Sequence, residues 1–420
     1  MASHPQSPRR WIAALLWRSY WGMATAMVVA SLPLVALLLR LDSTGASQAL
    51  TRIGWPFDFS AHTAETLASA LATIYGALVT LYFSISLLVL TLAAGNLGVR
   101  LIDRWISRRT TRITLGLLLA GLSWAILALL AVDPEHGQAA RLTITTLALA
   151  TVPLLCWLSY ALHDLGRTIH IDTAITALGK DAAADAQPFD DAVETGRAPD
   201  WDKGVAIRAR QEGYVEVVAL PLLTRLAAKG GGLIRIETEV GAHVMAGDLL
   251  ATAIGCDRHA CDDAVEAFAI GDFRSASQGA VFYVRLLVEI AARALSAAVN
   301  DFYTARACVD ALGPVMVAHG RLPQGALWLH DDDGAERVLV RGDRFRGLFD
   351  APLHALRQSA ASYPAVATRL LEVYRRVLAR DLEPAAAELI AQHLDILREH
   401  ALGHAETATD RDAIRNAAQA

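Results

Sequence analysis

Four long stretches without a charged side chain fill most of the first 163 residues of the chain. They hold 21, 34, 20 and 21 residues, and they lie between these pairs of ionisable residues: Arg18 and Arg40, Glu65 and Arg100, Arg112 and Asp133, and Arg141 and His163. An α-helix rises about 1.5 Å per residue, so about 20 apolar residues cross the hydrocarbon core of a bilayer. The four stretches therefore predict a transmembrane domain of four helices over residues 19–163.

A soluble fold would have to bury these stretches as core helices. Core helices of such length normally keep a polar face, so four uncharged stretches in succession favour a membrane. The composition agrees, because hydrophobic residues make up 54% and charged residues 19% of the chain, against about 45–50% and about 25% in soluble domains. The first stretch is longer than the apolar core of a typical signal peptide and three more follow it, so we expect it to remain as a helix.

Arginine residues gather on one side of the predicted spans. They precede the first span and fill the connection between the second and the third, as Arg9, Arg10, Arg18, Arg100, Arg104, Arg108, Arg109 and Arg112. The other two connections carry fewer basic residues and lie beside aspartate and glutamate. Because positive charge marks the cytoplasmic side, we expect a multi-pass protein of a bacterial inner membrane with both termini in the cytoplasm and residues 1–18 as a cytoplasmic tail.

The rest of the chain carries the opposite charge. Residues 1–163 hold 11 arginines and 6 acids, a net of +5, whereas residues 164–420 hold 27 basic residues and 37 acids, a net of −10. An acidic cytoplasmic region is not built to bind nucleic acid. Only three residues are lysines, and the common nucleotide-binding and hydrolase motifs are absent. We therefore expect no enzyme, no cofactor and no nucleic-acid partner, with the lipid bilayer as the first partner.

The second span carries a stripe of small or polar residues. They recur at spacings of four, three, four, four and seven, which place them on one helical face: Ser69, Thr73, Gly76, Thr80, Ser84 and Thr91. Such a face either packs against a neighbouring helix or lines a water-filled path, and both interpretations stay open. Its 34 residues would extend about 50 Å as a straight helix, so we expect tilting, a break near residues 95–98, or projection into the cytoplasm.

No Asp, Glu, Lys, Arg or His lies in the middle of any of the four stretches. Transporters that couple to protons or ions usually need such a residue at depth, because it holds charge reversibly. Coupled transport is therefore not expected. A passive pore, or a membrane anchor for a cytoplasmic sensor, fits the spans.

The cytoplasmic region is predicted to be of the α+β class. It divides into a helix extension and linker (164–204), a small β module (205–256), a helical module (262–318), a β-hairpin (319–345) and a C-terminal helical module (346–420). The last residues, about fifteen of them, are expected to fray. The fold class is thus an α-helical membrane protein of four transmembrane helices with a cytoplasmic α+β region.

The β module has a glycine pattern of its own. Val240, Gly241, Val244, Gly247 and Leu250 follow the order Val-Gly-x-x-Val-x-x-Gly-x-x-Leu, which resembles the end of a barrel-sandwich hybrid domain of the biotinyl and lipoyl type. Glycines suit tight turns and the apolar positions fill a small barrel. No lysine stands at a hairpin tip, so we expect a barrel used for assembly or ligand sensing, without an attached cofactor.

Two further groups of residues are candidate sites. Glu289 and Arg293 are four apart on a helix, which favours an ion pair. Asn300 or Asp301 is placed to cap the helix that starts at Phe302. The functional alternative is that Glu289, Arg293, Asn300 and Asp301 together form a polar site for a small ligand or a subunit contact.

A short cysteine-rich segment is a weak metal candidate. Cys256, His259 and Cys261 offer two thiolates and one imidazole within six residues. Zinc sites usually combine a tighter cysteine pair with a second half-site, which is missing nearby. The alternative is a loop after the β module with reduced thiols, and we predict no metal.

Several segments resemble one bacterial family. The similarity lies in the second span and in five further segments, namely residues 72–76 with Phe83-Ser84, Asn96 with Arg100, Leu115-Gly116, 163–169, the stretch opening at Gly213, and 289–296 with Asn300-Asp301 and Thr304-Ala305. They identify the chain, over roughly residues 15–400, as similar to the membrane-protein family called domain of unknown function 2254. The resemblance implies a membrane protein and no particular activity.

Three positions depart from the family pattern. Members carry prolines where Ala297 and Phe302 stand, and tend to carry an acid where Gly279 stands. Losing both prolines would loosen a catalytic turn in that loop, so the departures weaken a catalytic interpretation. Two function classes remain: a homo-oligomeric passive pore or channel-like transport protein with a cytoplasmic regulatory region, or a non-conducting membrane-anchored sensor or scaffold that binds a ligand or a protein partner.

Overall fold

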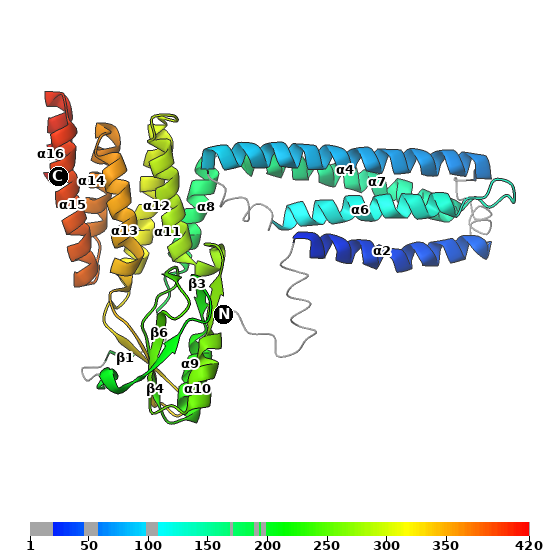
Figure 1. Cartoon of the computed structure of the whole chain (residues 1–420). Helices are drawn as coiled ribbons and strands as arrows, with labels where there is room; N and C mark the ends of the chain where they lie inside the picture. Colours follow the sequence, from blue (N-terminus) through cyan, green and yellow to red (C-terminus); the bar gives the residue numbers. More distant parts are fainter. Residues whose placement is uncertain are drawn as a thin grey trace. The chain divides into compact units, whose positions relative to one another are not determined.

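The computed structural model describes residues 20–45, 58–97, 108–168, 171–188, 193–194 and 199–419. The chain divides into two compact units, residues 1–170 and residues 171–420. Each unit has its own helices and its own packing, and each is described by itself below (Figure 1).

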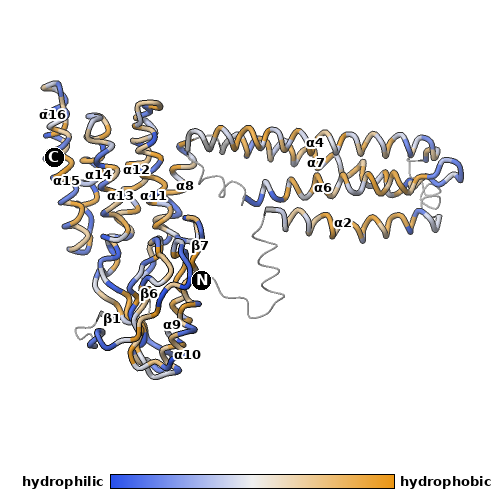
Figure 2. The backbone as a smooth tube through the Cα atoms, viewed as in Figure 1, coloured by the Kyte–Doolittle hydropathy of each residue, from blue (hydrophilic) through white to orange (hydrophobic). Residues whose placement is uncertain are grey.

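The first unit is a bundle of four long helices. They are α2 (Tyr20–Ser43), α4 (Ala61–Leu97), α6 (Arg109–Leu130) and α7 (Arg141–Thr168). Each contains a segment long and apolar enough to cross a membrane, namely Trp21–Ser43, Ala61–Leu92, Arg109–Leu130 and Arg141–Gly166. Figure 2 shows hydrophobic residues along all four helices. The predicted four spans are confirmed, and α4 continues unbroken to Leu97.

Helix α6 packs against the three other helices of the bundle. Two glycines on α6 allow this close approach. A Cβ added at Gly116 would meet the Met27 side chain and the Ala24 backbone of α2, and one added at Gly121 would overlap the ring of Tyr75 on α4. Small residues let membrane helices come close enough for van der Waals contact along their backbones. Tyr75 itself is buried, and its hydroxyl lies 3.1 Å from the Thr151 hydroxyl on α7.

Polar contacts hold both ends of the bundle. At one end, the carboxylate of Asp42 on α2 accepts hydrogen bonds from the backbone amides of Leu142 and Thr143, at 2.9 and 3.0 Å. It thus caps the first turn of α7, where helix amides have no partner within the helix. At the other end, Arg108 pairs with Asp164 at 3.3 Å. The helices therefore run alternately up and down through the bundle.

The second unit contains an array of helical hairpins. Its helices are α8 (Ile171–Ala184), α11 (Ala280–Ala294), α12 (Phe302–Gly320), α13 (Arg344–Ala360), α14 (Pro364–Leu378), α15 (Pro384–His404) and α16 (Ala408–Gln419). Helices α11, α13 and α15 form one layer, α12, α14 and α16 form a second, and α8 packs on both α11 and α12. Figure 1 shows these helices standing side by side.

One expectation for the helices of this region is wrong. The end of the chain was expected to fray, yet it forms α16, because Ile414 and Ala417 are buried against the array. Those two apolar residues are too few to stand out in a polar sequence.

The strands of the second unit form two sheets. A six-stranded sheet has the order β1-β8-β9-β4-β6-β2, and a three-stranded sheet has the order β5-β3-β7. The strands are β1 (Val193–Glu194), β2 (Val205–Arg208), β3 (Gly213–Val218), β4 (Leu233–Ile236), β5 (His243–Val244), β6 (Leu249–Ile254), β7 (Phe268–Gly271), β8 (Leu327–His330) and β9 (Glu336–Val340). The hairpin β8–β9 joins the larger sheet through a parallel pairing of β9 with β4. The region thus has strands as predicted, and the barrel-sandwich architecture stays a prediction.

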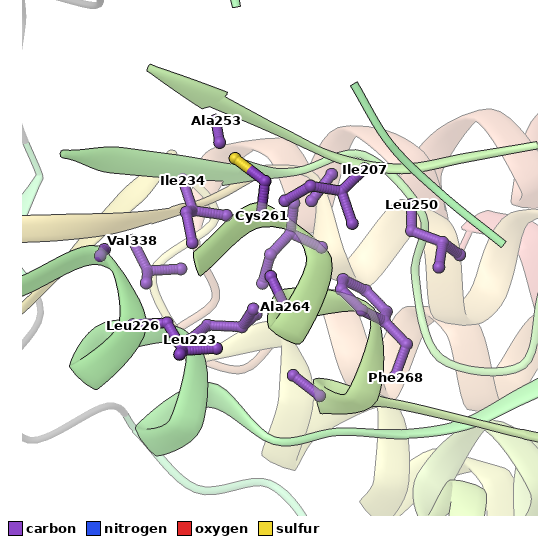
Figure 3. Packing of buried hydrophobic residues seen from close by; sticks show 14 of the residues in the cluster. Ile207, Leu223, Leu226, Ile234, Leu250, Ala253, Cys261, Ala264, Phe268 and Val338 are labelled. Carbon is purple, nitrogen blue, oxygen red and sulfur yellow. The ribbon is translucent and has the colours of Figure 1, made fainter. Parts of the chain in front are cut away.

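Helices α9 (Leu220–Lys229) and α10 (Arg258–Ala264) cover one side of these strands. Figure 3 shows the shared core, to which Leu223 and Leu226 of α9 and Cys261 of α10 contribute beside strand residues such as Ile234. These side chains are at most 8% exposed. The other wall of this core comes from apolar residues of β4 and β6, namely Ile234, Ile236, Leu250, Ala251 and Ala253.

Candidate functional site

The polar stripe lies on the outer face of α4. Gly76 is half-buried, and the other five residues of the stripe are exposed, namely Ser69, Thr73, Thr80, Ser84 and Thr91. The residues that α4 buries against the bundle are instead Ala64, Ala68, Leu71, Tyr75, Tyr82, Ser86 and Val89. Because a helix turns about 100° per residue, the stripe and this buried face lie on roughly opposite sides of α4. The stripe is therefore not a packing seam among the described helices of its own bundle.

The threonine hydroxyls of the stripe bond back to their own helix. Thr73, Thr80 and Thr91 each donate to the carbonyl oxygen four residues earlier, at 2.9, 2.9 and 2.8 Å. Such bonds satisfy the hydroxyl donor and leave the oxygen lone pairs available. The stripe can thus face lipid, another subunit or water without leaving a hydroxyl donor unsatisfied, and whether it lines a path or packs against another helix stays open.

One apolar side chain interrupts the stripe. Leu87 occupies the position between Ser84 and Thr91 on the same helical face, three residues after one and four before the other. It is 61% exposed. The stripe therefore presents hydroxyls on either side of one leucine, and exposed apolar side chains such as Leu81 and Leu88 flank it.

The second candidate group gathers at the connection between α11 and α12. The carboxylate of Asp301 accepts hydrogen bonds from the Thr304 amide at 3.1 Å and the Thr304 hydroxyl at 2.6 Å, so Asp301 caps α12. The hydrogen bonds from Thr304 also lower the pKa of Asp301. Asn300 precedes it with a left-handed φ of 51°, a conformation that asparagine tolerates better than most residues. Capping by Asp301 is confirmed.

Glu289 and Arg293 lie on the last turns of α11 at 3.9 Å from each other. Both side chains are about one-third exposed. This is the predicted pair at i and i+4, and its long distance and exposure make it worth only a few tenths of a kcal/mol. These residues have structural roles at one end of the hairpin, and their use as a ligand or subunit site stays a prediction.

The three metal candidates differ in their exposure to solvent. Cys261 is buried in the core of the β module, as Figure 3 shows, whereas His259 is exposed. Burial raises the pKa of Cys256 to about 11 and also raises the pKa of Cys261. Metals bind the thiolate. Across the described ranges, no three His, Cys, Asp or Glu side chains are grouped to hold a metal ion.

Gly279 explains one departure from the family pattern. Its φ of 61° with a ψ of −135° suits glycine alone. The carboxylate of Asp185 occupies the place that a side chain at residue 279 would need. Asp185 uses this place to accept a hydrogen bond from the Ala280 amide at 2.7 Å, at the start of α11. Family members tend to carry an acid at position 279 itself. In this chain the carboxylate beside the start of α11 is instead that of Asp185, which lies far earlier in the sequence.

A groove between α12 and α14 was not predicted from the sequence. Its volume is about 650 Å³, and it is lined by Asp310, Gly313, Pro314, Val317, Ala318, Arg321, Arg369, Val373, Arg376, Val377 and Arg380. The two helices run parallel here, since Arg369 bonds Asp310 at 2.6 Å and Gly313 approaches Val373 further along. A ligand site in proteins typically has a volume of about 300–1,000 Å³, so the groove is of suitable size.

The arginines of this groove differ in whether an acidic side chain neutralises them. Arg369 is neutralised by Asp310 and Glu372, and its hydrogen bonds to both raise its pKa. Arg321, Arg376 and Arg380 are exposed along the rest of the rim. They lie where α12 and α14 end, so they also offset the negative ends of two helix dipoles. The spacing of arginines at 369, 376 and 380 could have marked one helical face in the sequence, but the partner face on α12 could not be foreseen.

These features define a membrane protein with four apolar helices and a C-terminal region of helices and strands. The chain belongs to the predicted membrane protein family DUF2254, which matches residues 17–376. The resemblance seen in the sequence is thereby confirmed. Helices α15 and α16 lie beyond the matched residues.

Relatives in two mycobacteria are similar over most of the chain. An uncharacterised protein of Mycobacterium bovis (strain ATCC BAA-935 / AF2122/97) is 27% identical over 364 residues, which cover 80% of this chain and 68% of that protein. An uncharacterised protein of Mycobacterium tuberculosis (strain ATCC 25618 / H37Rv) shows the same identity and coverage. No solved structure matches the chain.

Proposed function

We propose that the protein is a homo-oligomeric passive pore of the bacterial inner membrane, with the stripe of α4 facing the axis of the oligomer. The observation that carries the proposal is the position of this stripe on the side of α4 that its own bundle leaves uncovered. Copies arranged around a closed symmetry axis would bring their stripes together. Both termini and the second unit would lie in the cytoplasm, where the second unit regulates the path.

The chemistry of the stripe suits a passive path, in which transport is not coupled to the movement of a proton or another ion. Hydroxyl oxygens can replace part of the hydration shell of a small solute, whereas no ionisable side chain lies at mid-span to bind and release a proton. In the oligomer, the copies of Leu87 would form an apolar ring between the hydroxyl groups of Ser84 and those of Thr91. Such a constriction gates a pore by expelling water.

Flux measurements in liposomes test this proposal. Thr80→Trp places a large ring in the path, so we expect it to abolish the flux of small ions or solutes that the wild-type protein supports. Leu81→Trp is the matched control, because Leu81 is 48% exposed on a neighbouring face of α4 and should leave the flux unchanged. Leu87→Ser removes the apolar ring, so we expect it to increase the flux.

The results that would contradict the pore are equally specific. A wild-type protein that is monomeric in detergent and carries no flux excludes it. If Thr80→Trp and Leu81→Trp reduce flux equally while Leu87→Ser has no effect, the stripe does not line the path. The gain expected for Leu87→Ser separates a pore from a loss of folding, because an unfolded variant cannot gain flux.

The groove favours a second candidate, a membrane-anchored sensor. We propose that it binds an organic anion with an apolar body, because three exposed arginines stand beside an apolar floor that includes Val317 and Val373. We expect 1-naphthyl phosphate to raise the melting temperature of the full chain, with 1-naphthol as the uncharged control. The double variant Arg376→Glu with Arg380→Glu should lose this effect, whereas Arg398→Glu, outside the groove, should keep it. Equal shifts for both variants would exclude the groove as the site.

A further inference from the structure

Three apolar side chains stand exposed where α11 turns into α12. In this connection, the α11–α12 tip (residues 297–303), Val299 is 51% exposed, Phe302 39% and Tyr303 70%. The two aromatic rings lie against each other, with centroids 4.6 Å apart. Large apolar side chains grouped on a surface often mark an interaction site.

The tip is held in one conformation by its backbone. The Asn300 amide bonds to the Ser296 carbonyl at 2.9 Å, and the Asp301 amide bonds to the Ala294 carbonyl at 2.7 Å. The cap formed by Asp301 then fixes the start of α12, which begins with Phe302. The apolar side chains are therefore presented on a fixed loop, and little further ordering is needed when they bind.

The contacts of α8 place the tip at a defined end of the helical array. The start of α11 bonds to Asp185, just after the end of α8, and His319 near the end of α12 lies 2.9 Å from the Ala182 carbonyl. Earlier along both helices, Gly179 of α8 lies against Ala311 of α12, since a Cβ added at Gly179 would come within 3.1 Å of the Ala311 side chain. Helices α8 and α12 therefore run in the same direction. The tip and the first turn of α8 thus share one end of the array.

Chain length ties this same end to the membrane. The fourth span ends at Gly166 and its helix at Thr168. Helix α8 starts at Ile171, three Cα steps later, and three steps of 3.8 Å reach at most about 11 Å. By chain length alone, the first residue of α8 therefore lies within about 11 Å of the last residue of a membrane-spanning helix.

We propose that the α11–α12 tip inserts into the headgroup region of the bilayer that the four spans cross. Aromatic rings with a polar edge, such as that of Tyr303, favour this region, and apolar neighbours such as Val299 and Phe302 gain by leaving water. Asp301 is the one charged residue within the tip (residues 297–303). The contact therefore depends on apolar burial and not on attraction to anionic lipids.

A fluorescent label at residue 303 tests the proposal in the full chain. Tyr303→Cys is made in a Cys156→Ser background, since Cys156 is the exposed native cysteine. Burial raises the pKa of Cys256, Cys261 and Cys308, which makes these thiols slow to label. The protein carries an NBD fluorophore, is placed in phosphatidylcholine liposomes, and is exposed to lipids with a nitroxide near the headgroup or to iodide in water.

Phe273→Cys is the matched control. Phe273 is 77% exposed and precedes α11, whose start lies at the opposite end of the helix from the tip. Val299→Cys gives a second position within the tip. We expect the label at 303 and at 299 to emit at shorter wavelength, to lose most of its fluorescence to nitroxide lipids and to be protected from iodide, with the reverse at 273.

Two results would overturn the proposal. Equal quenching of residues 303 and 273 by iodide would show that the tip is in water. Protection from iodide without quenching by nitroxide lipids would show that protein, such as a second copy, covers it. Adding anionic lipid should leave the expected quenching unchanged, and a strong dependence on anionic lipid would contradict the apolar basis of the contact.

Discussion

Replacing Gly121 with leucine is expected to unfold most of the four-helix bundle. Even a Cβ atom at this position would overlap the ring of Tyr75, which is buried between α4 and α6. Overpacking a well-packed core typically costs about 1–3 kcal/mol and occasionally more. Leucine adds four carbon atoms where none fits, so we expect a loss of at least about 3 kcal/mol in the free energy of unfolding. Titration with a denaturing detergent measures it.

Two further variants establish the cause. Gly166→Leu is the matched control, because nothing lies within 4 Å of a Cβ at Gly166, and it should stay within about 0.5 kcal/mol of the wild type. Tyr75→Ala removes the obstructing ring, so the double variant with Gly121→Leu should be about 1–3 kcal/mol more stable than the sum of the single effects. Strict additivity would show that the two residues do not compete for one space.

Replacing Asp42 with alanine is expected to destabilise the bundle by about 2–3 kcal/mol, because its charged carboxylate caps a helix with several bonds. Besides the two amides of α7, the Thr143 hydroxyl donates to Asp42 at 2.7 Å. Without the carboxylate, three donors lose their acceptor at one end of the bundle. Thermal unfolding in a single detergent is the measurement.

A neighbouring carboxylate provides the control for Asp42. Asp58 lies at the same end of the bundle, is 68% exposed and pairs with Arg141 at 3.3 Å. Exposed pairs are worth about 0–1 kcal/mol, so Asp58→Ala should have a small effect. Asp42→Asn keeps one acceptor oxygen and should fall between the wild type and Asp42→Ala. Equal effects of Asp42→Ala and Asp58→Ala would show that general charge, and not the cap, stabilises this end.

The features that the sequence predicts well are local ones. The four spans follow from uncharged length alone, and the cap at Asp301 follows from one acid before a helix. The periodicity of the second span also places its polar residues on one face. It does not say which way that face points, because this depends on contacts of Tyr75 and its neighbours with other helices.

The features that the sequence does not predict depend on distant partners. Cys261 lies in a core built from several strands. The close spacing of Cys256, His259 and Cys261 in the sequence therefore does not bring the three side chains together as a metal site. The groove needs α12 and α14 side by side, and neither helix alone shows it. The larger sheet likewise needs a hairpin that lies far along the chain from the strands it joins.

That sheet has a consequence for how the protein is made. β1 pairs with β8 and β4 pairs with β9, so the hairpin α11–α12 lies in sequence between strands of one sheet. Closing such long loops costs entropy before any pairing gives stability, and it slows folding. The sheet is completed only after Val340 has left the ribosome, when all four spans have already been synthesised. The membrane helices therefore have time to enter the bilayer while β4 still has one unpaired edge, and an unpaired strand edge can pair with the wrong partner.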